Sequence, residues 1–379
     1  MIDSVSFYLN SDQFEMRPNN KLDGKKNQQG RGFTINSEYC EGYVKNLKKQ
    51  RIYCPSITKA IKTNKITGTK EVLEIQVSLP KLIYGSNLFE VDSEDLDKIY
   101  SALLYRLNDL GITTTKEHLQ KAIIKRADFS KIIKLPEIYG EANYIVEKLA
   151  KFDYKPSSDY NLNKYNDDNH GRSIKFWNTT QGLVIYDVIG NILSHGFTKT
   201  ELTINKGFRE GSVKRTALRI ELSLEKKKSF EAVVWRRLKD TEKKKNFYLE
   251  DIFKEGLSRK ILLDAFNKVF NKSALGLLTL SEMKDNILRA YLDNAGISVK
   301  KQEKLYYWVG MATNFGISGT WEQIKLKYSG GSVATCKNQI ATTLTELPKI
   351  DGTLPNLIQF LRAELEKFES IKPKKTLGL

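Results

Sequence analysis

Apolar residues alternate with polar ones in short segments of the first two-thirds of the chain. In residues 218–225, Leu or Ile occupies every even position, while Arg219, Glu221 and Ser223 stand between them. A period of two is typical of a strand that buries one face and exposes the other. Shorter or less regular segments predict four more strands: 72–79, 123–130, 174–177 and 183–188.

Helical spacing of apolar residues separates these strands. Asp92 and Ser93 precede a helix that we expect to end at Gly111, and a second helix is expected over about 140–152. A polar stretch rich in Asn, Asp and Ser, residues 154–171, predicts a loop. Strands with one polar face, mixed with helices, predict an α+β fold with a mainly antiparallel sheet and an exposed polar face.

The strand pattern ends near residue 247, and helical spacing follows. The predicted helices are 249–270, 280–294, 300–313, 321–328 and 354–368. The predicted parts of the chain are a sheet domain over 1–246, a helical domain over 247–347, and a terminal helix with a basic tail over 348–379. The segments 321–328 and 333–344 around Gly330 and Gly331 have the outline of a helix-turn-helix, which ordinary helical bundles also contain.

Composition narrows the class of protein. Of the 379 residues, 40% are apolar and 28% are charged, as in globular proteins. No stretch approaches about 18 consecutive apolar residues, and no basic-then-apolar leader follows Met1, so we expect neither a membrane span nor conventional secretion. Cys40, Cys54 and Cys336 form no C-x-x-C pair and leave one thiol unpaired, which fits a reducing compartment and a cytoplasmic location.

The formal net charge of +17 indicates a polyanionic partner, with nucleic acid as the favoured one. About half of the basic excess lies between residues 206 and 245. Three basic runs, Lys226–Lys228, Arg236-Arg237 and Lys243–Lys245, are close enough in sequence to predict a surface that faces phosphates. A merely solvated basic surface is the alternative.

The motifs of several enzyme classes are absent. Only three histidines occur, and they form no H-E-x-x-H, no His-hydrophobe-His pair and no zinc spacing; a Walker loop is also missing. Three carboxylates remain on the polar faces of predicted strands: Glu74, Asp128 and Glu221. Carboxylate oxygens suit Mg²⁺ or Mn²⁺, although a polar residue on the exposed face of a strand needs no function. By the same reasoning Tyr186 alone would be a strand aromatic that packs on the core.

Five segments, taken in order, resemble the replication initiators of filamentous bacteriophages, the gene-two/gene-X family. They are Met1–Asp3, Leu73–Phe89, Ile124–Ser130, Phe176–Tyr186 and Leu218–Ser229. The resemblance implies a metal-dependent endonuclease of the relaxase or rolling-circle initiator type, which nicks one strand at an origin in double-stranded phage or plasmid DNA. It also rejoins the displaced single strand into a circle. Host helicase and polymerase would act with it in the bacterial cytoplasm.

The same resemblance assigns roles to residues. Tyr186 matches the tyrosine that attacks the scissile phosphate, which gives a 5′-phosphotyrosine and a free 3′-OH. Glu74, Asp128 and Glu221 match carboxylates that bind a divalent metal, Mg²⁺ or Mn²⁺. From their charge or aromatic character, and not from the resemblance, the expected DNA-contacting residues are Lys125, Arg126, Lys175, Trp177, Lys226, Lys227, Lys228, Arg236 and Arg237.

The match to the family is incomplete at one position, and two alternative functions remain open. Many relatives carry a Lys two residues after the tyrosine, whereas Val188 stands there in this chain, so Lys175 or Lys125 would have to supply the cation that a phenol nucleophile needs. A DNA-binding replication or regulatory protein without catalysis would explain the charge equally well. A metal nuclease that uses water is the other alternative, but Glu74-Ile75-Gln76 lacks the lysine typical of such sites.

Overall fold

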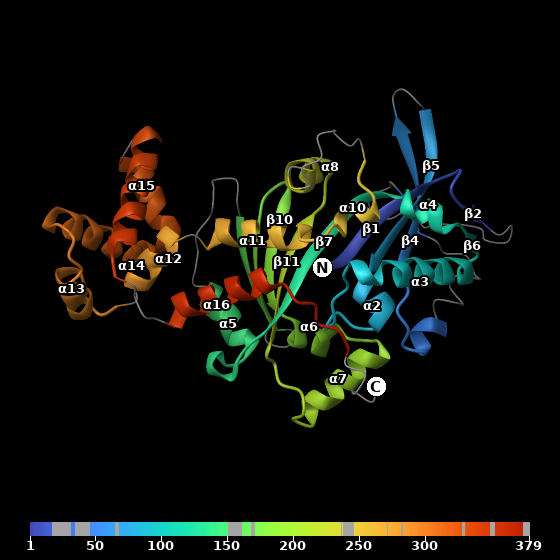
Figure 1. Ribbon diagram of the computed structural model, residues 1–379, viewed down its shortest axis with the longest axis horizontal. Coiled ribbons are helices and arrows are strands. Elements are labelled where there is room, and N and C mark those ends of the chain that lie inside the picture. Colours follow the sequence, from blue (N-terminus) through green and yellow to red (C-terminus); the bar gives the residue numbers. More distant parts are fainter. Residues whose placement is uncertain are drawn as a thin grey trace.

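Among the described residues, nine strands form one continuous antiparallel sheet (Figure 1). This computed structural model describes residues 1–16, 32–34, 46–64, 68–150, 161–167, 171–235, 237, 246–270, 272–281, 283–327, 330–348 and 353–373. Across the sheet, the strands follow the order β3-β4-β5-β1-β7-β11-β10-β9-β8. The predicted α+β class with an antiparallel sheet is therefore confirmed.

The five predicted strands are present, and all except the one expected over 218–225 are longer than expected. The sheet contains β1 (Ile2–Asn10), β3 (Gly32–Thr34), β4 (Ser56–Asn64), β5 (Gly68–Ser78), β7 (Ile123–Lys134), β8 (Asn161–Asp167), β9 (Gly171–Trp177), β10 (Gln181–Asp187) and β11 (Ala217–Leu224). A separate pair joins β2 (Glu15–Met16) to β6 (Ile112–Thr113). The first strand of the chain thus lies in the middle of the sheet, between β5 and β7.

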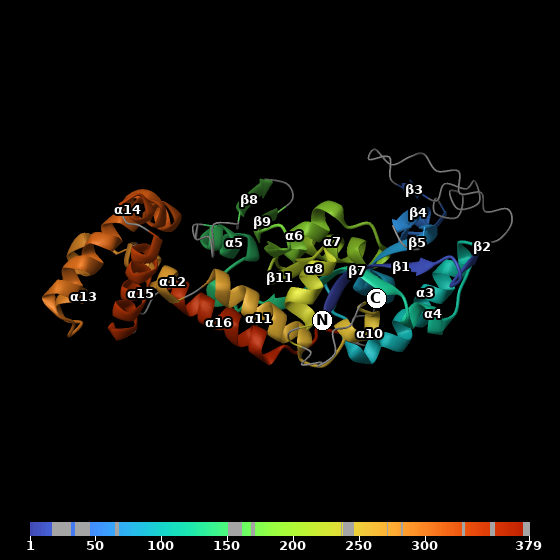
Figure 2. The same ribbon diagram turned by 90° about the horizontal axis from the view of Figure 1, so that it is seen from above.

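Helices cover the apolar face of the sheet. The even-numbered residues of β11 are fully buried there, together with Ala127 and Phe129 of β7. The covering helices include α3 (Leu96–Asp109), α5 (Ala142–Ala150), α11 (Leu257–Val269) and α16 (Thr353–Lys367). Figures 1 and 2 both show α11 and α16 side by side, and both helices contact β7.

The opposite, polar face is covered in part by two helices that the sequence pattern did not predict. Figure 2 shows α6 (Val188–His195) and α7 (Lys199–Arg209) across the sheet from α11 and α16. Their apolar side chains form a second, smaller core with Ile132 of β7 and Ala217 of β11. The polar face is therefore partly enclosed, and not fully exposed as expected.

The C-terminal helices form two groups. The helices α12 (Lys272–Ser281), α13 (Asp285–Asp293), α14 (Val299–Lys327) and α15 (Gly330–Glu346) lie together beyond one end of the sheet (Figure 1). In contrast, α11 contacts β7 and β11, and α16 returns to contact β7. The domain boundary expected after residue 246 therefore lies before α11, a helix that packs on the sheet.

The remaining helical elements are short. They are α2 (Leu79–Tyr84), the 3₁₀ turns Ser93–Asp95 and Glu137–Tyr139, α4 (Lys116–Gln120), α8 (Lys227–Phe230), the π-helical turn Glu231–Trp235 and α10 (Leu249–Ile252). The Asp92 side chain accepts a hydrogen bond from the Glu94 amide and caps the turn that leads into α3, as its position predicted. No helix of the described ranges combines the length and the hydropathy that a membrane crossing requires.

Two local predictions were wrong. The polar stretch 154–171 was expected to be a loop, but residues 161–167 form β8, which pairs with β9 along seven residue pairs. Polar residues are tolerated there because β8 is the last strand at that end of the sheet. Val188 was expected to end a strand, yet it begins α6, since the Asp187 carboxylate caps the helix by accepting from the Gly190 amide at 2.9 Å.

The packing of α11 on the sheet predicts the effect of a core substitution. The Phe270 ring, which follows α11, is fully buried and meets the fully buried Phe176 ring of β9 at 5.8 Å between centroids. Phe270→Ala should lower the free energy of unfolding by about 3–5 kcal/mol in denaturant titrations of the whole protein. The matched variant Phe315→Ala removes a ring that is 52% exposed and should change it by about 0.5 kcal/mol or less. Equal effects of the two variants would contradict this packing.

Candidate active site on the polar face of the sheet

Cross-strand pairing gathers polar side chains on neighbouring strands. Tyr186 of β10 lies opposite Arg219 of β11, and Ser223 of β11 lies opposite Asp128 of β7. Because side chains two residues apart share a face, Glu221 lies on this face as well. The Tyr186 hydroxyl is 3.4 Å from Glu221 Oε2. The structure thus brings together three of the residues that the sequence singled out: Tyr186, Asp128 and Glu221.

Asp3 joins this group because β1 contains a bulge. Ile2 pairs with Phe129 and Ser4 pairs with Asp128, so Asp3 is the extra residue between two register pairs. Without the bulge, alternation would turn Asp3 toward the apolar face, where Val5 lies. With it, Asp3 reaches the polar face and its carboxylate accepts from Arg219 Nη1 at 2.7 Å. Simple strand phase could not reveal this residue.

Arg219 is the centre of the group and the largest fully buried side chain in the described part of the protein. Its guanidinium donates to Asp3 and to the backbone carbonyl of Asn87. Burial disfavours a charged guanidinium, but Tyr186, Asp3 and Glu221 outweigh burial and raise the Arg219 pKa. Arg219 is therefore a permanent cation beside the tyrosine. We call Asp3, Asp128, Tyr186, Arg219 and Glu221 the Arg219 cluster.

The environment keeps the Tyr186 phenol neutral. Burial raises the Tyr186 pKa well above its usual value of 10; the Arg219 cation opposes this shift, whereas Glu221 and Asp3 add to it. A neutral phenol is a weak nucleophile. Chemistry at Tyr186 therefore needs additional positive charge at the carboxylates or at the substrate.

The three carboxylates repel one another. Burial, Asp3 and Asp128 together raise the pKa of Glu221 to about 8. Burial also raises the pKa of Asp128, although the Arg126 guanidinium donates two hydrogen bonds to that carboxylate, at 3.2 and 3.1 Å. A cation placed among these oxygens would relieve their repulsion, and hard oxygen donors are the ligands that Mg²⁺ and Mn²⁺ prefer.

The described residues contain no set of three His, Cys, Asp or Glu side chains that already converge on a common point as metal ligands do. Arg126 holds Asp128, and Arg219 holds Asp3. The oxygen donors are of the type that binds a divalent cation. In this structure, however, Asp128 and Asp3 each pair with an arginine.

Glu74 lies apart from the other two predicted metal ligands. It shares their face of the sheet, but β1 separates β5 from β7, and Glu74 pairs with Tyr8 whereas Asp128 pairs with Ser4. Four residues of strand correspond to about 13 Å. Glu74 instead accepts from Lys125 Nζ at 2.7 and 2.8 Å and from Ser6 at 3.0 Å. Glu74 therefore does not meet Asp128 and Glu221, because it lies four residues further along the strands.

Two of the four predicted DNA-contacting residues of the sheet are paired with carboxylates of the protein. Lys125 pairs with Glu74, and Arg126 pairs with Asp128. Lys175 lies over Gly182 of β10, where an added Cβ would stand 3.1 Å from Lys175 Cε. The buried indole N–H of Trp177 has no hydrogen-bond partner among the described residues.

The basic runs after β11 differ in what the structure describes. Lys226 is exposed. Arg237 donates from Nε to Asp264 of α11 at 3.0 Å and also donates to the Val233 carbonyl. Its guanidinium is therefore engaged within the protein. Lys227 and Lys228 begin α8, but their side chains lie outside the described part, as do Arg236 and Lys243–Lys245 entirely.

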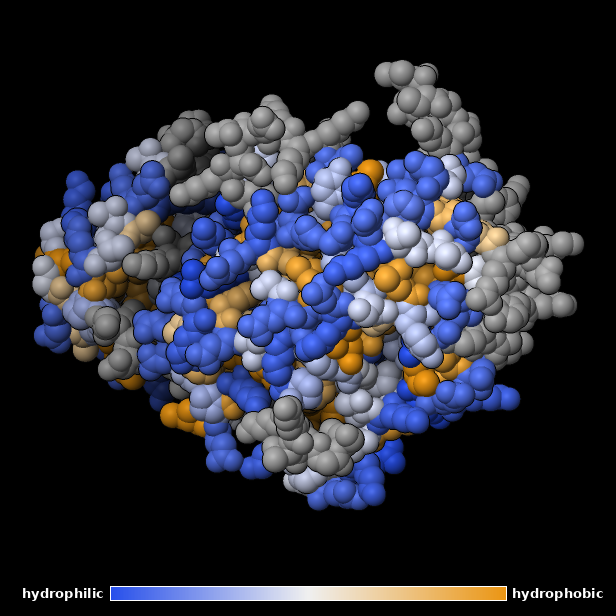
Figure 3. Space-filling view, turned by 45° about the vertical axis from the view of Figure 1, so that its right-hand side comes forward, coloured by the Kyte–Doolittle hydropathy of each residue, from blue (hydrophilic) through white to orange (hydrophobic). Residues whose placement is uncertain are grey.

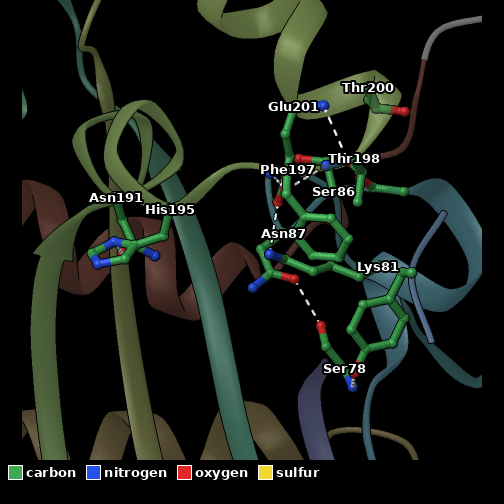
Figure 4. Close-up of polar contacts among 12 residues, drawn as sticks. Ser78, Lys81, Ser86, Asn87, Asn191, His195, Phe197, Thr198, Thr200 and Glu201 are labelled. Atoms are coloured by element: carbon green, nitrogen blue, oxygen red, sulfur yellow. Dashed lines mark hydrogen bonds and ion pairs between the residues drawn. The ribbon is translucent and has the colours of Figure 1, made fainter. Parts of the chain in front are cut away.

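The loop that carries Asn87 is held between β5 and α7 (Figure 4). Ser78 donates to the Asn87 side chain at 2.7 Å, and Thr198, which caps α7, donates to the Gly85 carbonyl. Lys81 of α2 pairs with the buried Glu201 of α7 at 2.9 Å. These contacts fix the carbonyl of Asn87 and with it the Arg219 guanidinium.

Comparison of the chain with models of known protein families, with curated proteins and with solved structures finds no match.

Proposed function

We propose that the protein is a rolling-circle replication initiator that nicks and rejoins one DNA strand at an origin through Tyr186. The observation that carries the proposal is the Arg219 cluster, in which a tyrosine, a permanent cation and three carboxylates lie on adjacent strands. The net charge of +17 and the resemblance to filamentous phage initiators support the same function.

In the proposed reaction, Tyr186 Oη attacks the scissile phosphorus and the bond from phosphorus to the 3′ oxygen breaks. A 5′-phosphotyrosine forms, and the phenol proton ends on the released 3′-OH. The reverse attack by a 3′-OH rejoins the strand and needs no nucleotide cofactor, because the phosphotyrosine conserves the phosphodiester bond. Arg219 stabilises negative charge on the tyrosine oxygen in both directions.

Asp128 and Glu221 remain the proposed metal ligands, and Asp3 replaces Glu74 as the third oxygen donor. A divalent cation bound there would polarise the scissile phosphate. Arg126 would have to release Asp128, to which it donates two hydrogen bonds.

A second candidate is a DNA-binding protein without catalysis. The pairing of the buried Arg219 with Asp3 and the packing of Tyr186 against the smaller core favour it, because such contacts can serve stability alone. In that case the protein would bind origin DNA and Tyr186 would never react.

Tyr186→Phe separates the two candidates. The variant keeps the ring and its packing but lacks the oxygen that attacks, so nicking of supercoiled origin DNA and formation of a covalent protein–DNA adduct should both disappear. Binding to origin DNA should persist. The adduct of the unaltered protein should map by mass spectrometry to a peptide with Tyr186. An adduct on another tyrosine would reject the assignment, and absence of any cleavage would favour the binding protein.

Metal dependence is tested by pairing two carboxylate variants. EDTA should abolish nicking, and Mg²⁺ or Mn²⁺ should restore it. Asp128→Asn should slow nicking by about a hundredfold or more. Glu74→Gln should have a much smaller effect, since Glu74 lies about 13 Å along the strands from the cluster. Equal losses in the two variants would restore Glu74 to the site.

The cation beside Tyr186 is tested in the same assay. Arg219→Lys keeps a positive charge but cannot hold Asp3, Asn87 and the phenol together, so nicking should fall by roughly a hundredfold to a thousandfold. Lys125→Gln, which removes a cation paired with Glu74, should change the rate by less than about threefold. Thermal unfolding of both variants checks that the fold survives. A large loss with Lys125→Gln alone would make Lys125 the functional cation.

A further inference from the structure

A cavity of about 320 Å³ lies within α14, at a distance in sequence from the Arg219 cluster. Gly316, at φ 71° and ψ 175°, interrupts the helix, and the residues before and after it fold beside each other. Only glycine adopts such a conformation readily, so the residue type at position 316 permits the kink. The cavity opens between the two halves of the helix, which contribute Tyr307, Trp308, Met311, Gln323, Ile324, Leu326 and Lys327.

The floor of the cavity is apolar and its rim combines an aromatic ring with a cation. Trp308 and Ile324 are buried, whereas Tyr307 is 46% exposed and Leu326 is 81% exposed. The Tyr307 ring packs edge-on against Trp308, with 5.0 Å between centroids. Lys327 Nζ stands 5.6 Å from the centre of the Tyr307 ring. The Tyr307 ring is thus partly exposed, and a positive charge lies over it.

The polar groups of the rim form no ion pair or hydrogen bond within the described part of the chain. Among the described residues, Lys327 has no carboxylate partner, whereas its neighbour Lys325 pairs with Glu322 at 2.6 Å. The Tyr307 hydroxyl and the Gln323 amide have no hydrogen-bond partner in the same part of the chain. An exposed leucine and an exposed tyrosine thus line the cavity together with this lysine.

The size and chemistry of the cavity select the class of ligand. A volume near 320 Å³ is at the lower end for small-molecule pockets and accommodates one ring system, but not a protein helix. Aromatic side chains stack on the bases of single strands, while lysines contact the phosphates. The net charge of the protein favours a polyanion.

We propose that this cavity is a binding site for an unpaired nucleotide of single-stranded DNA. The base stacks on Tyr307 above the apolar floor of Trp308 and Ile324, and Lys327 contacts the adjacent phosphate. The Gln323 amide is available to a polar edge of the base. The site itself does not depend on any reaction at Tyr186, whereas a role in holding a displaced strand rests on the proposed function.

Ultraviolet cross-linking of the full-length protein to oligothymidylate tests the site directly. The cross-linked peptide should lie within residues 299–327. Tyr307→Leu should remove this cross-link and weaken oligothymidylate binding at the site by about fivefold to a hundredfold, the range for loss of one stacking ring. Tyr307→Phe should preserve both. Cross-links that avoid this segment would overturn the proposal.

A matched control separates stacking in the cavity from general cation and aromatic effects. Tyr105 is 63% exposed and Arg106 lies over its ring at 5.3 Å, but the cavity does not include it. Tyr105→Leu should leave the cross-link unchanged. Lys327→Gln should reduce the salt dependence of binding by about 0.7 in the logarithmic slope, as for one phosphate contact on a single strand. Equal behaviour of Tyr307→Leu and Tyr105→Leu would also overturn the site.

Because cross-linking does not require cleavage, its result is independent of the nicking assay. A protein that fails to nick but cross-links through Tyr307 would retain this site and lose only the proposed catalytic function.

Discussion

The buried guanidinium of Arg219 constrains how the middle of the sheet is assembled. A buried charge without partners costs several kcal/mol, so the chain must bring acceptors to it from separate regions. Asp3 comes from β1 and the Asn87 carbonyl comes from the loop after α2, while Glu221 on the same strand adds a nearby negative charge. The bulge in β1 and the contacts that hold the loop between β5 and α7 both serve this requirement. Tyr186 is positioned as a consequence, because it is the cross-strand neighbour of Arg219.

A second buried ion pair joins the C-terminal segment to the same sheet. Glu90 and Lys131 are both almost fully buried, and their charged atoms lie 3.2 Å apart. Glu90 also accepts from the backbone amides of Ile132 at 2.6 Å and Ile371 at 3.0 Å. The segment after α16 therefore reaches the edge of the polar face. With α11 and α16 packed on the other face, segments from the end of the chain thus contact both faces of the sheet.

The two candidate sites lie on different kinds of secondary structure. The Arg219 cluster lies on central strands that pair on both sides, which suits phosphodiester chemistry because reacting atoms must be held within a fraction of an ångström. The Tyr307 cavity lies in the helices beyond the end of the sheet, within a helix that bends at Gly316. A bent helix can still bind an unpaired strand, since stacking demands less geometric accuracy than catalysis. Figure 3 shows hydrophilic residues over much of the visible face, with hydrophobic patches among them.

The sequence by itself determined the local structure and the face on which each side chain lies. Alternation in 218–225 and in 123–130 placed Arg219, Glu221 and Asp128 on the polar face, and helical spacing located α3, α5 and most of the C-terminal helices. Period and capping depend on neighbouring residues in the chain, so they can be read without knowledge of the fold.

Only the tertiary structure decided which of these residues meet. Insertion of β1 between β5 and β7 moved Glu74 out of the cluster, and a one-residue bulge moved Asp3 into it. The pairing of Arg219 with Asp3, and the placement of α6 and α7 over the polar face, likewise join parts of the chain that are distant in sequence. Periodicity specifies a face but neither strand order nor register, because those depend on the packing of the whole core and on the partners that a buried charge must find.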